Sequence, residues 1–365
     1  MTLTLALTCG EPAGIGAEVA LKALAAGLPP GVEAVLVGPR TVWAAAAGLV
    51  PGGFDLARWR IREPAASEPA GRPDRPDRPD HSERADRAPP ADWSWGRPTA
   101  RSGRVAAEAV ELAARLALAR EVDGLVTAPL SKEGLHAAGR PFPGHTELLA
   151  SLCGPGHRAV MMLGGPRLKV FLVTTHLPLA RVPGQVTREA VLATVTAAHR
   201  GLERDLGIAS PRLAVCALNP HGGEGGVLGF EERDVIAPSL EEARAAEIRA
   251  VGPLPADSAF HRAAQGEFDA VVAMYHDQGL APLKLLHFWD GVNVTLNLPL
   301  VRTSPDHGTA LDLAGRGAAR PDSFREAIRW AAEIARRRRA ARDGSDLSDP
   351  SDGSDKPMAT RRRQP

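Results

Sequence analysis

Short apolar runs separated by helical patterns recur along most of this chain and constrain its fold more than any other feature. The runs lie at 3–8, 34–38, 124–128, 159–163, 169–175, 213–218, 269–274 and 292–298. They are apolar at successive positions rather than at every second one, which is typical of strands covered by helices on both faces. The pattern therefore predicts the α/β class with a mostly parallel sheet.

Amphipathic patterns fill several of the intervals between these runs. We expect helices over Val105–Arg120, Thr187–Asp205, Glu231–Ile248 and Ser323–Arg339. The last of them begins with Ser323, three residues before Glu326, which is the spacing of a capping box.

Two stretches lack the aliphatic residues that a core requires. Residues 62–101 are crowded with Pro, Arg and Asp and contain the near-perfect repeat RPDRPDRPD at 72–80, and residues 340–365 are similarly polar. Such segments cannot bury enough apolar surface to offset the entropy of ordering them. We expect a disordered insertion at 62–101 and a disordered tail at 340–365, both solvated segments rather than interaction arms.

The charge balance and the cysteines exclude several classes of protein. Lys and Arg total 44 against 43 Asp and Glu, so the net charge of +1 provides no field to hold nucleic acid or an anionic membrane. The three cysteines are far apart and form no C-x-x-C pair, which argues against disulfides or a thiolate zinc site and favours a reducing cytoplasm. The first residues lack the basic segment with which a signal peptide begins, so we expect no signal peptide. No run approaches about 18 apolar residues, so we expect no membrane span.

Two familiar nucleotide-binding motifs are incomplete. Gly14 and Gly16 begin a dinucleotide fingerprint, but Val19 stands where the third glycine belongs. Residues 134–139 have the glycine spacing of a P-loop, yet Arg140-Pro141 replaces the Lys-Ser/Thr pair that would reach the phosphates and Mg²⁺. Neither a standard Rossmann site nor an NTPase is predicted.

Three histidines follow three predicted strands. His176 comes after the run at 169–175, His221 after 213–218 and His276 after 269–274. Ligands bind at the carboxyl edge of open α/β sheets, and neutral imidazoles suit Zn²⁺, Co²⁺ and similar ions. A lone histidine is usually structural, but three at equivalent strand ends favour a shared metal site.

Glycine clusters and a helix start adjoin these positions. GEPAGIGAE at 10–18 opens a helix after the first run, and NPHGGEGGVLG at 219–229 surrounds His221, so backbone N–H groups could approach a ligand. His145 and Thr146 begin a helix within 143–154, where free N–H groups favour an anion, although Thr146 could simply cap that helix.

The densest group of polar residues lies between 274 and 315. Lys284, Asn293 and Arg302 could converge there on a phosphate, because Arg supplies a planar fork and Lys a compact charge.

Seven motifs, in this order, resemble those of the 4-hydroxythreonine-4-phosphate dehydrogenase family of pyridoxal phosphate biosynthesis. They are GEPAGIGAE, TAPLSKEGLHAAG, PGHTELLA, the TTH ending at His176, LNPHGGEGG, YHDQGLAPLK and RTSPDHGTALDLAG. The departures are Glu11, where the family more often has Asp, together with the insertion and the tail. Since Glu11 keeps the charge, it casts little doubt on the resemblance.

The resemblance implies a two-lobed α/β/α sandwich of the isocitrate/isopropylmalate-dehydrogenase type. One lobe would comprise 1–61 and 102–140 with 300–339, and the other 141–299. It also implies a homodimer with the active site, and its metal, shared between subunits.

Carried over motif by motif, the resemblance assigns the metal and the substrate. The metal ligands would be His176 and His221 of one subunit with His276 of the other, and the substrate contacts would be His145, Thr146, Lys284, Asn293 and Arg302. The metal would be Zn²⁺, Mg²⁺ or Co²⁺. We place the cofactor, NAD or NADP, against Gly14, Gly16, Gly222 and Gly223.

The implied reaction is oxidation of 4-phosphooxy-L-threonine to a 3-oxo acid that loses CO₂ and leaves 3-amino-2-oxopropyl phosphate. Lys284 and Asp257 are our candidates for the base and the acid, although Asp257 could instead cap the helix that follows it. The alternatives are a sister dehydrogenase for threonate or erythronate 4-phosphate, a non-catalytic metal- or phosphate-binding protein, and, on fold analogy alone, a phosphate acyltransferase.

Overall fold

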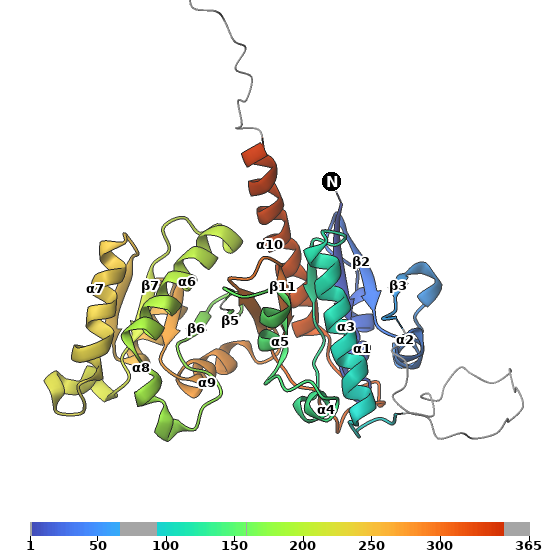
Figure 1. Cartoon of the computed structure of the whole chain (residues 1–365), viewed down its shortest axis with the longest axis horizontal. Helices are drawn as coiled ribbons and strands as arrows, with labels where there is room; N and C mark the ends of the chain where they lie inside the picture. Colours follow the sequence, from blue (N-terminus) through green and yellow to red (C-terminus); the bar gives the residue numbers. More distant parts are fainter. Residues whose placement is uncertain (1, 66–92, 158, 347–365) are drawn as a thin grey trace, which may run out of the picture.

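The computed structural model describes residues 2–65, 93–157 and 159–346, and the strands of these residues form one continuous sheet (Figure 1). Its order is β3-β2-β1-β4-β11-β10-β5-β6-β9-β7-β8. The strands are β1 Leu3–Thr8, β2 Val32–Val37, β3 Arg60–Arg62, β4 Gly124–Val126, β5 Val160–Gly164, β6 Lys169–Leu172, β7 Leu213–Cys216, β8 Ala250–Leu254, β9 Ala270–Ala273, β10 Val292–Leu296 and β11 Arg302–Pro305. All neighbours are parallel except β10 with β11 and β5, and β5 with β6, so the predicted mostly parallel α/β sheet is confirmed.

Helices cover this sheet, as strands buried on both faces require. They are α1 Gly16–Ala25, α2 Arg40–Ala47, α3 Ala100–Leu118, α4 Lys132–Ala137, α5 His145–Leu152, α6 Arg188–Leu206, α7 Ala237–Ala245, α8 Ala256–Ala264, α9 His276–His287 and α10 Asp322–Asp346. Figure 1 shows α1–α3 with β1–β3 at one end of the molecule, α6–α8 with β7 at the other, and α10 between them. None of the described helices has the length and apolar character that crossing a bilayer requires.

Eight strands fall where the apolar runs predicted them, and three more were not predicted. β11 reads RTSP and β3 reads RIR, so neither contains an apolar run, yet β11 is buried between β4 and β10. The third, β8, reads AVGPL and is partly exposed at the far edge. β11 is buried by its neighbours, whereas β3 and β8 are partly exposed edge strands, so none of the three has the run of buried apolar residues on which the prediction depends.

The helix predictions need three corrections. α3 begins at Ala100 rather than at Val105, because Thr99 caps it by accepting from the backbone N–H of Ser102 at 3.1 Å. The predicted helix over 231–248 is a π-helical turn, Glu232–Ile236, followed by α7. Ser323 is no capping-box residue, because its hydroxyl donates to the Gly291 carbonyl at 2.5 Å and accepts from the N–H of Asp306 at 3.0 Å.

The boundaries of the predicted insertion and tail were too wide. Residues 66–92 and 347–365, where most of both predictions fall, lie outside the described residues. The flank at 93–101 is ordered: the Gly96 N–H donates to the Ala13 carbonyl at 2.8 Å, and the rings of Trp93 and Trp95 meet edge to face with centroids 4.8 Å apart. Residues 340–346 continue α10, because its Ala and Arg residues are strong helix formers.

The two predicted lobes correspond to two halves of the sheet. β1–β4 and β11 belong to the range assigned to the first lobe, and β5–β10 to the second. The boundary runs between neighbouring strands β11 and β10. The division into two domains stays a prediction, since the sheet is continuous across it.

The strand order places the three predicted metal ligands at one edge. β6, β9 and β7 are consecutive and mutually parallel. Their carboxyl ends, which precede His176, His276 and His221, therefore lie side by side.

Candidate active site

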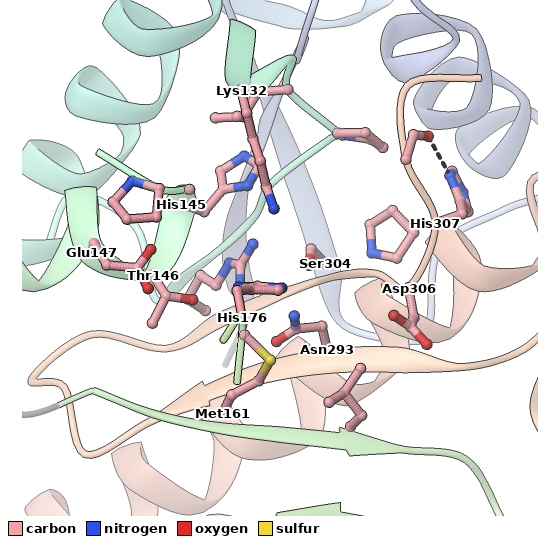
Figure 2. Close-up of a pocket in the computed structure, with 18 of the residues that line it drawn as sticks. Lys132, His145, Thr146, Glu147, Met161, His176, Asn293, Ser304, Asp306 and His307 are labelled. Carbon is pink, nitrogen blue, oxygen red and sulfur yellow. Dashed lines mark hydrogen bonds between the residues drawn. The ribbon is translucent and has the colours of Figure 1, made fainter. Parts of the chain in front are cut away.

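A cavity of about 340 Å³ lies beyond the ends of β4, β6 and β9 (Figure 2). It gathers side chains from five regions of the chain: the segment around the start of α4, the start of α5, strand β5, the segments after β6 and β9, and the β10–β11 hairpin with the loop after it. Its polar lining includes Lys132, His145, Thr146, Glu147, His176, His276, Asn293, Arg302, Ser304, Asp306 and His307. We call it the substrate cavity.

Arg302 supplies a buried positive charge to this cavity. The residue is 2% exposed, and its guanidinium donates to the hydroxyls of Thr127, at 2.8 and 3.1 Å, and Thr295, at 2.9 Å. It makes no ion pair with any carboxylate in the described part of the chain. Burial lowers the pKa of Arg302 to about 9, which leaves the group charged at neutral pH. The Glu147 carboxylate in the same cavity acts on Arg302 electrostatically but forms no ion pair with it. A buried cation hydrogen-bonded only to hydroxyls favours an anionic ligand.

Three polar atoms in the cavity are buried with neither a hydrogen bond nor an ion pair among the described residues. They are the Nε2 atom of His307, the Nε2 atom of His145 and the Oδ1 atom of Asn293. Burial, and then the charge of Arg302, hold the pKa of His145 well below its ordinary value, so its imidazole is neutral. Thr146 is the second residue of α5, beside these atoms. The structure thus brings four of the five predicted substrate residues to one cavity.

His176 and His276 lie together on the wall of the substrate cavity. Their ring centroids are 5.6 Å apart, and Nδ1 of His276 lies 2.7 Å from Oδ1 of Asp277. Burial, then the charges of Lys132 and His276, lower the pKa of His176 and keep its imidazole neutral. Two adjacent imidazoles, one of them held by a carboxylate, are suitable metal ligands.

His221 is not part of this pair. It lies in a separate cavity of about 350 Å³ with Asp257, Tyr275 and Gln278. Its backbone is left-handed, with φ 54°, within a loop whose residues 221–225 all have positive φ. Among the described residues no group of three possible metal ligands exists. Within one chain, the geometry pairs His176 with His276, whereas the resemblance implied His176 with His221.

Lys284 is held away from the substrate cavity by Asp306. Its ammonium forms an ion pair with the Asp306 carboxylate at 2.7 Å and also bonds to the Asp306 carbonyl. Lys284 lines instead a neighbouring cavity of about 480 Å³, together with Ile15, Phe288, Trp289, His307 and Leu313. Asp306, His307 and Gly308 border both cavities, so the Lys284–Asp306 pair stands between them. Burial raises the pKa of Asp306 despite this pairing.

The second acid–base candidate, Asp257, is exposed in the first turn of α8. Its Oδ1 accepts from the backbone N–H of Ser258 at 2.7 Å. This contact fits the helix-end role that the sequence left open. The same residue borders the His221 cavity, so a role at that cavity stays a prediction.

Three of the four glycines assigned to the cofactor, Gly14, Gly16 and Gly223, make close contacts within the chain itself, whereas a Cβ on Gly222 would meet no atom within 4 Å. A Cβ on Gly16 would lie 2.6 Å from the Cys9 carbonyl oxygen, and one on Gly14 would lie 2.8 Å from that of Thr309. Ile15, between them, borders the 480 Å³ cavity. Gly222 and Gly223 have φ values of 70° and 78° in the His221 loop. A cofactor role for the four glycines stays a prediction.

The sequence analysis missed Lys132, the first residue of α4. Figure 2 shows its side chain extending into the cavity toward His176. The residue comes shortly after β4, as the three histidines come after their strands. The histidines were found because they follow apolar runs. The same search after the run at 124–128 would have found Lys132.

Comparison with known proteins gives a consistent result. Residues 32–331 match the model of a family described as pyridoxal phosphate biosynthetic protein PdxA. A 4-hydroxythreonine-4-phosphate dehydrogenase of Caulobacter vibrioides is 46% identical over 92% of this chain and 98% of its own length, and one of Geobacter metallireducens is 58% identical over 67% and 72%. The crystal structure of such a dehydrogenase from Klebsiella pneumoniae has a TM-score of 0.76 and 36% identity, covering 92% of this chain and 100% of that one.

Proposed function

The chain belongs to the PdxA family of pyridoxal phosphate biosynthetic proteins, and from this premise we propose that it oxidises 4-phosphooxy-L-threonine at the secondary hydroxyl. NAD⁺ or NADP⁺ takes the hydride. The 3-oxo acid then loses CO₂ to give 3-amino-2-oxopropyl phosphate, on the route to pyridoxal phosphate. The observation that carries the proposal is the buried guanidinium of Arg302, without an ion-pair partner in the described chain, in the same cavity as the imidazoles of His176 and His276.

The phosphate end of the substrate binds at Arg302. Its guanidinium is fixed by the Thr127 and Thr295 hydroxyls, so little side-chain entropy is lost when an anion arrives. A phosphate oxygen accepts from this guanidinium and from the N–H groups at the start of α5, where Thr146 lies. The unpartnered Oδ1 atom of Asn293 is an acceptor, so it takes a hydrogen bond from a donor group of the substrate.

His176 and His276 are the residues that we propose to hold a divalent metal, Zn²⁺, Co²⁺ or Mg²⁺. When bound, such an ion supplies Lewis-acid polarisation of the substrate oxygen during both oxidation and decarboxylation. The two adjacent imidazoles fit two positions of its coordination shell. A third ligand has to come from outside this pair.

We propose a homodimer in which His221 of a second subunit completes the set. Val227, Leu228 and Phe230 follow His221 in the chain and leave large apolar side chains exposed. Burying them against a second copy would bring the His221 loop to the other subunit's substrate cavity, at a gain of about 25 cal/mol per Å² of apolar surface.

The nicotinamide cofactor occupies the 480 Å³ cavity in this proposal. Its lining is mainly apolar, with Ile15, Trp289 and Leu313, and it adjoins the substrate cavity at Asp306 and His307. Hydride transfer requires the cofactor ring and the substrate carbon to meet at such a boundary. Lys284 lies outside the substrate cavity, so in this proposal it exchanges a proton with the substrate through Asp306, which borders both cavities. We also propose a cytoplasmic location, which rests only on the cysteine pattern.

Parallel assays test this function and its nearest alternative. Purified protein with a divalent metal and NAD⁺ or NADP⁺ is given 4-phosphooxy-L-threonine, and separately threonate 4-phosphate, while NAD(P)H absorbance is followed. We expect turnover of the amino acid with a higher kcat/KM. Faster oxidation of the sugar acid would assign the chain to the sister activity, and no NAD(P)H from either compound would refute the proposed function.

A further inference from the structure

We propose that Lys132 is a substrate-binding residue that holds the carboxylate of the phosphorylated hydroxy acid and so selects acids over their decarboxylated counterparts. The inference rests on the proposed function, because it assigns a ligand group to the same cavity. It concerns a residue that the motif comparison left without a role.

The position of Lys132 is fixed by the packing of its helix. Ser131 caps α4 by accepting from the N–H of Gly134 at 3.0 Å. Gly134 lies directly against Gly103 of α3, where an added Cβ on Gly103 would come within 2.0 Å of the Gly134 carbonyl oxygen. Two helices that approach this closely allow little movement between them. The Lys132 side chain therefore starts from a rigid support and reaches into the cavity toward His176 (Figure 2).

The charges that line the substrate cavity leave Lys132 unmatched. Lys284, which belongs to the neighbouring cavity, is neutralised by Asp306, whereas Lys132 forms neither a hydrogen bond nor an ion pair with any described residue. Arg302, the other cation without an ion pair, is fixed in β11 by its hydrogen bonds to hydroxyls. Glu147 is a carboxylate of the same lining that forms no ion pair with either cation among the described residues. Two cations and one carboxylate match a ligand with two anionic groups and one ammonium, as the proposed amino acid has.

The proposed substrate has this pair of groups. Its phosphate is at one end, and its carboxylate is attached to the carbon next to the one that is oxidised. The carboxylate therefore lies close to the reacting hydroxyl, which our proposal places at His176 and His276. Lys132 extends toward His176 from the wall, so it is the cation available at that end.

A lysine at this position affects substrate and product differently. During decarboxylation the bond between the carboxylate carbon and its neighbour breaks, and its electron pair moves toward the adjacent ketone to give an enolate, which then takes a proton. CO₂ leaves without charge, so the ammonium loses its partner while Arg302 keeps the phosphate. Lys132 thus favours binding of the acid and does not retain the product.

Calorimetric titration of the metal-loaded protein tests this role. The ligands are 4-phosphooxy-L-threonine and 3-amino-2-hydroxypropyl phosphate, which lacks only the carboxylate. We expect Lys132→Met to weaken binding of the acid about 10- to 100-fold, and binding of the decarboxylated compound less than about twofold. Lys132→Arg should recover part of the loss. Glu133→Gln, on the next exposed position of α4, is the matched control and should bind both compounds as the wild type does.

The possible results separate the carboxylate role of Lys132 from the proposed function. If Lys132→Met weakens binding of both compounds equally, the residue binds phosphate or supports the pocket, and the carboxylate role is wrong. Unchanged binding of the acid would overturn it as well. If wild-type protein binds neither compound and forms no NAD(P)H, the proposed function itself fails, and the role of Lys132 fails with it.

Discussion

Arg302 is the residue whose charge most directly connects structure with function. Its guanidinium is hydrogen-bonded only to neutral hydroxyls, Thr127 and Thr295, in a position that is 2% exposed. Taking a cation out of water without an opposing charge costs stability unless a ligand provides that charge. Such a cost is common at binding sites, where stability and function conflict.

Replacing Arg302 by Met should therefore have opposite effects on binding and stability. We expect KM for the phosphorylated substrate to rise at least about 100-fold, with slow turnover of the dephosphorylated analogue nearly unchanged. The free energy of unfolding should stay equal or increase by about 1 kcal/mol. Steady-state kinetics and urea denaturation measure the two effects. Equal kinetic losses on both substrates, or marked destabilisation, would indicate a structural arginine.

Residue types could be assigned to the site from sequence more easily than residue contacts. His145, Thr146, Asn293 and Arg302 were expected together and are together. Lys284 was expected with them but bonds to Asp306, a residue that no motif argument had paired with it. Side-chain pairing across a fold depends on distances that spacing in the sequence does not contain.

At the scale of elements, α6 and α10 are joined through one buried carboxylate. Asp205, at the end of α6, accepts two hydrogen bonds from Arg338 of α10, both at 2.8 Å, and two from Arg204, at 2.8 and 2.9 Å. Burial alone would raise the pKa of Asp205, but the hydrogen bonds from Arg338 and Arg204 outweigh it and lower the pKa. The ionised carboxylate is thus stabilised by folding.

Asp205→Asn should cost about 3 kcal/mol of unfolding free energy at neutral pH, because it leaves the mostly buried guanidinium of Arg338 without its carboxylate partner. A lowered pKa gives stability that is present above the unfolded value of about 4 and is lost as the pH falls through the folded value. The difference from wild type should therefore be constant between about pH 5 and 8 and shrink below about pH 4. Asp234→Asn, which breaks an exposed pair with Arg233, is the control and should change little. A loss independent of pH would contradict the linkage.

The residues just before α3 show that the predicted insertion at 62–101 extends too far toward the C-terminus. Thr99 caps the helix, and the Gly96 N–H bonds to Ala13, beside the loop that begins α1. Deleting residues 62–101 behind a short Gly/Ser linker should lower the melting temperature, since the cap alone is worth about 1 kcal/mol. Deleting only 66–92 keeps these contacts and is the matched control. Equal melting temperatures for the two deletions would show that the ordered flank contributes nothing.

Local patterns located most elements but not their limits. Apolar runs gave eight strands because buried strands need such runs, and they missed β11, whose polar residues include Arg302 itself. The end of α10 was missed for the opposite reason. Its composition resembles a solvated tail, yet alanine and arginine continue a helix that begins on the core.

At the scale of the whole molecule, the strand order determines which residues can meet. The order β6-β9-β7 puts the strand before His276 between the strands before His176 and His221, so the last two are two strands apart. His276 contacts His176. The antiparallel pairing of β10 and β11 brings Asn293 and Arg302 to the same cavity. The class of the sheet could be predicted from the sequence, but its order could not, because long-range strand pairing leaves no local signal.

The distribution of thiols gives an independent test of this packing. Cys9 and Cys216 are each 0% exposed, and burial raises the pKa of both to about 12, helped at Cys9 by Glu11. Cys153 is partly exposed. Iodoacetamide at pH 8 should therefore modify native protein at Cys153 only and denatured protein at all three cysteines, as mass spectrometry can show. Native labelling of Cys9 or Cys216 at the rate of Cys153 would contradict the buried positions.

The measurement that tests the central claim most directly is the stoichiometry of the reaction before and after metal removal. Chelator-treated protein is given 4-phosphooxy-L-threonine and NAD⁺ or NADP⁺, then Zn²⁺, Co²⁺ or Mg²⁺ is restored, and NAD(P)H and CO₂ are both quantified. Our account predicts no turnover without metal and, after restoration, equal amounts of NAD(P)H and CO₂, with His176→Ala and His276→Ala inactive throughout. Full turnover by metal-free protein, or undiminished turnover by the histidine variants, would contradict it.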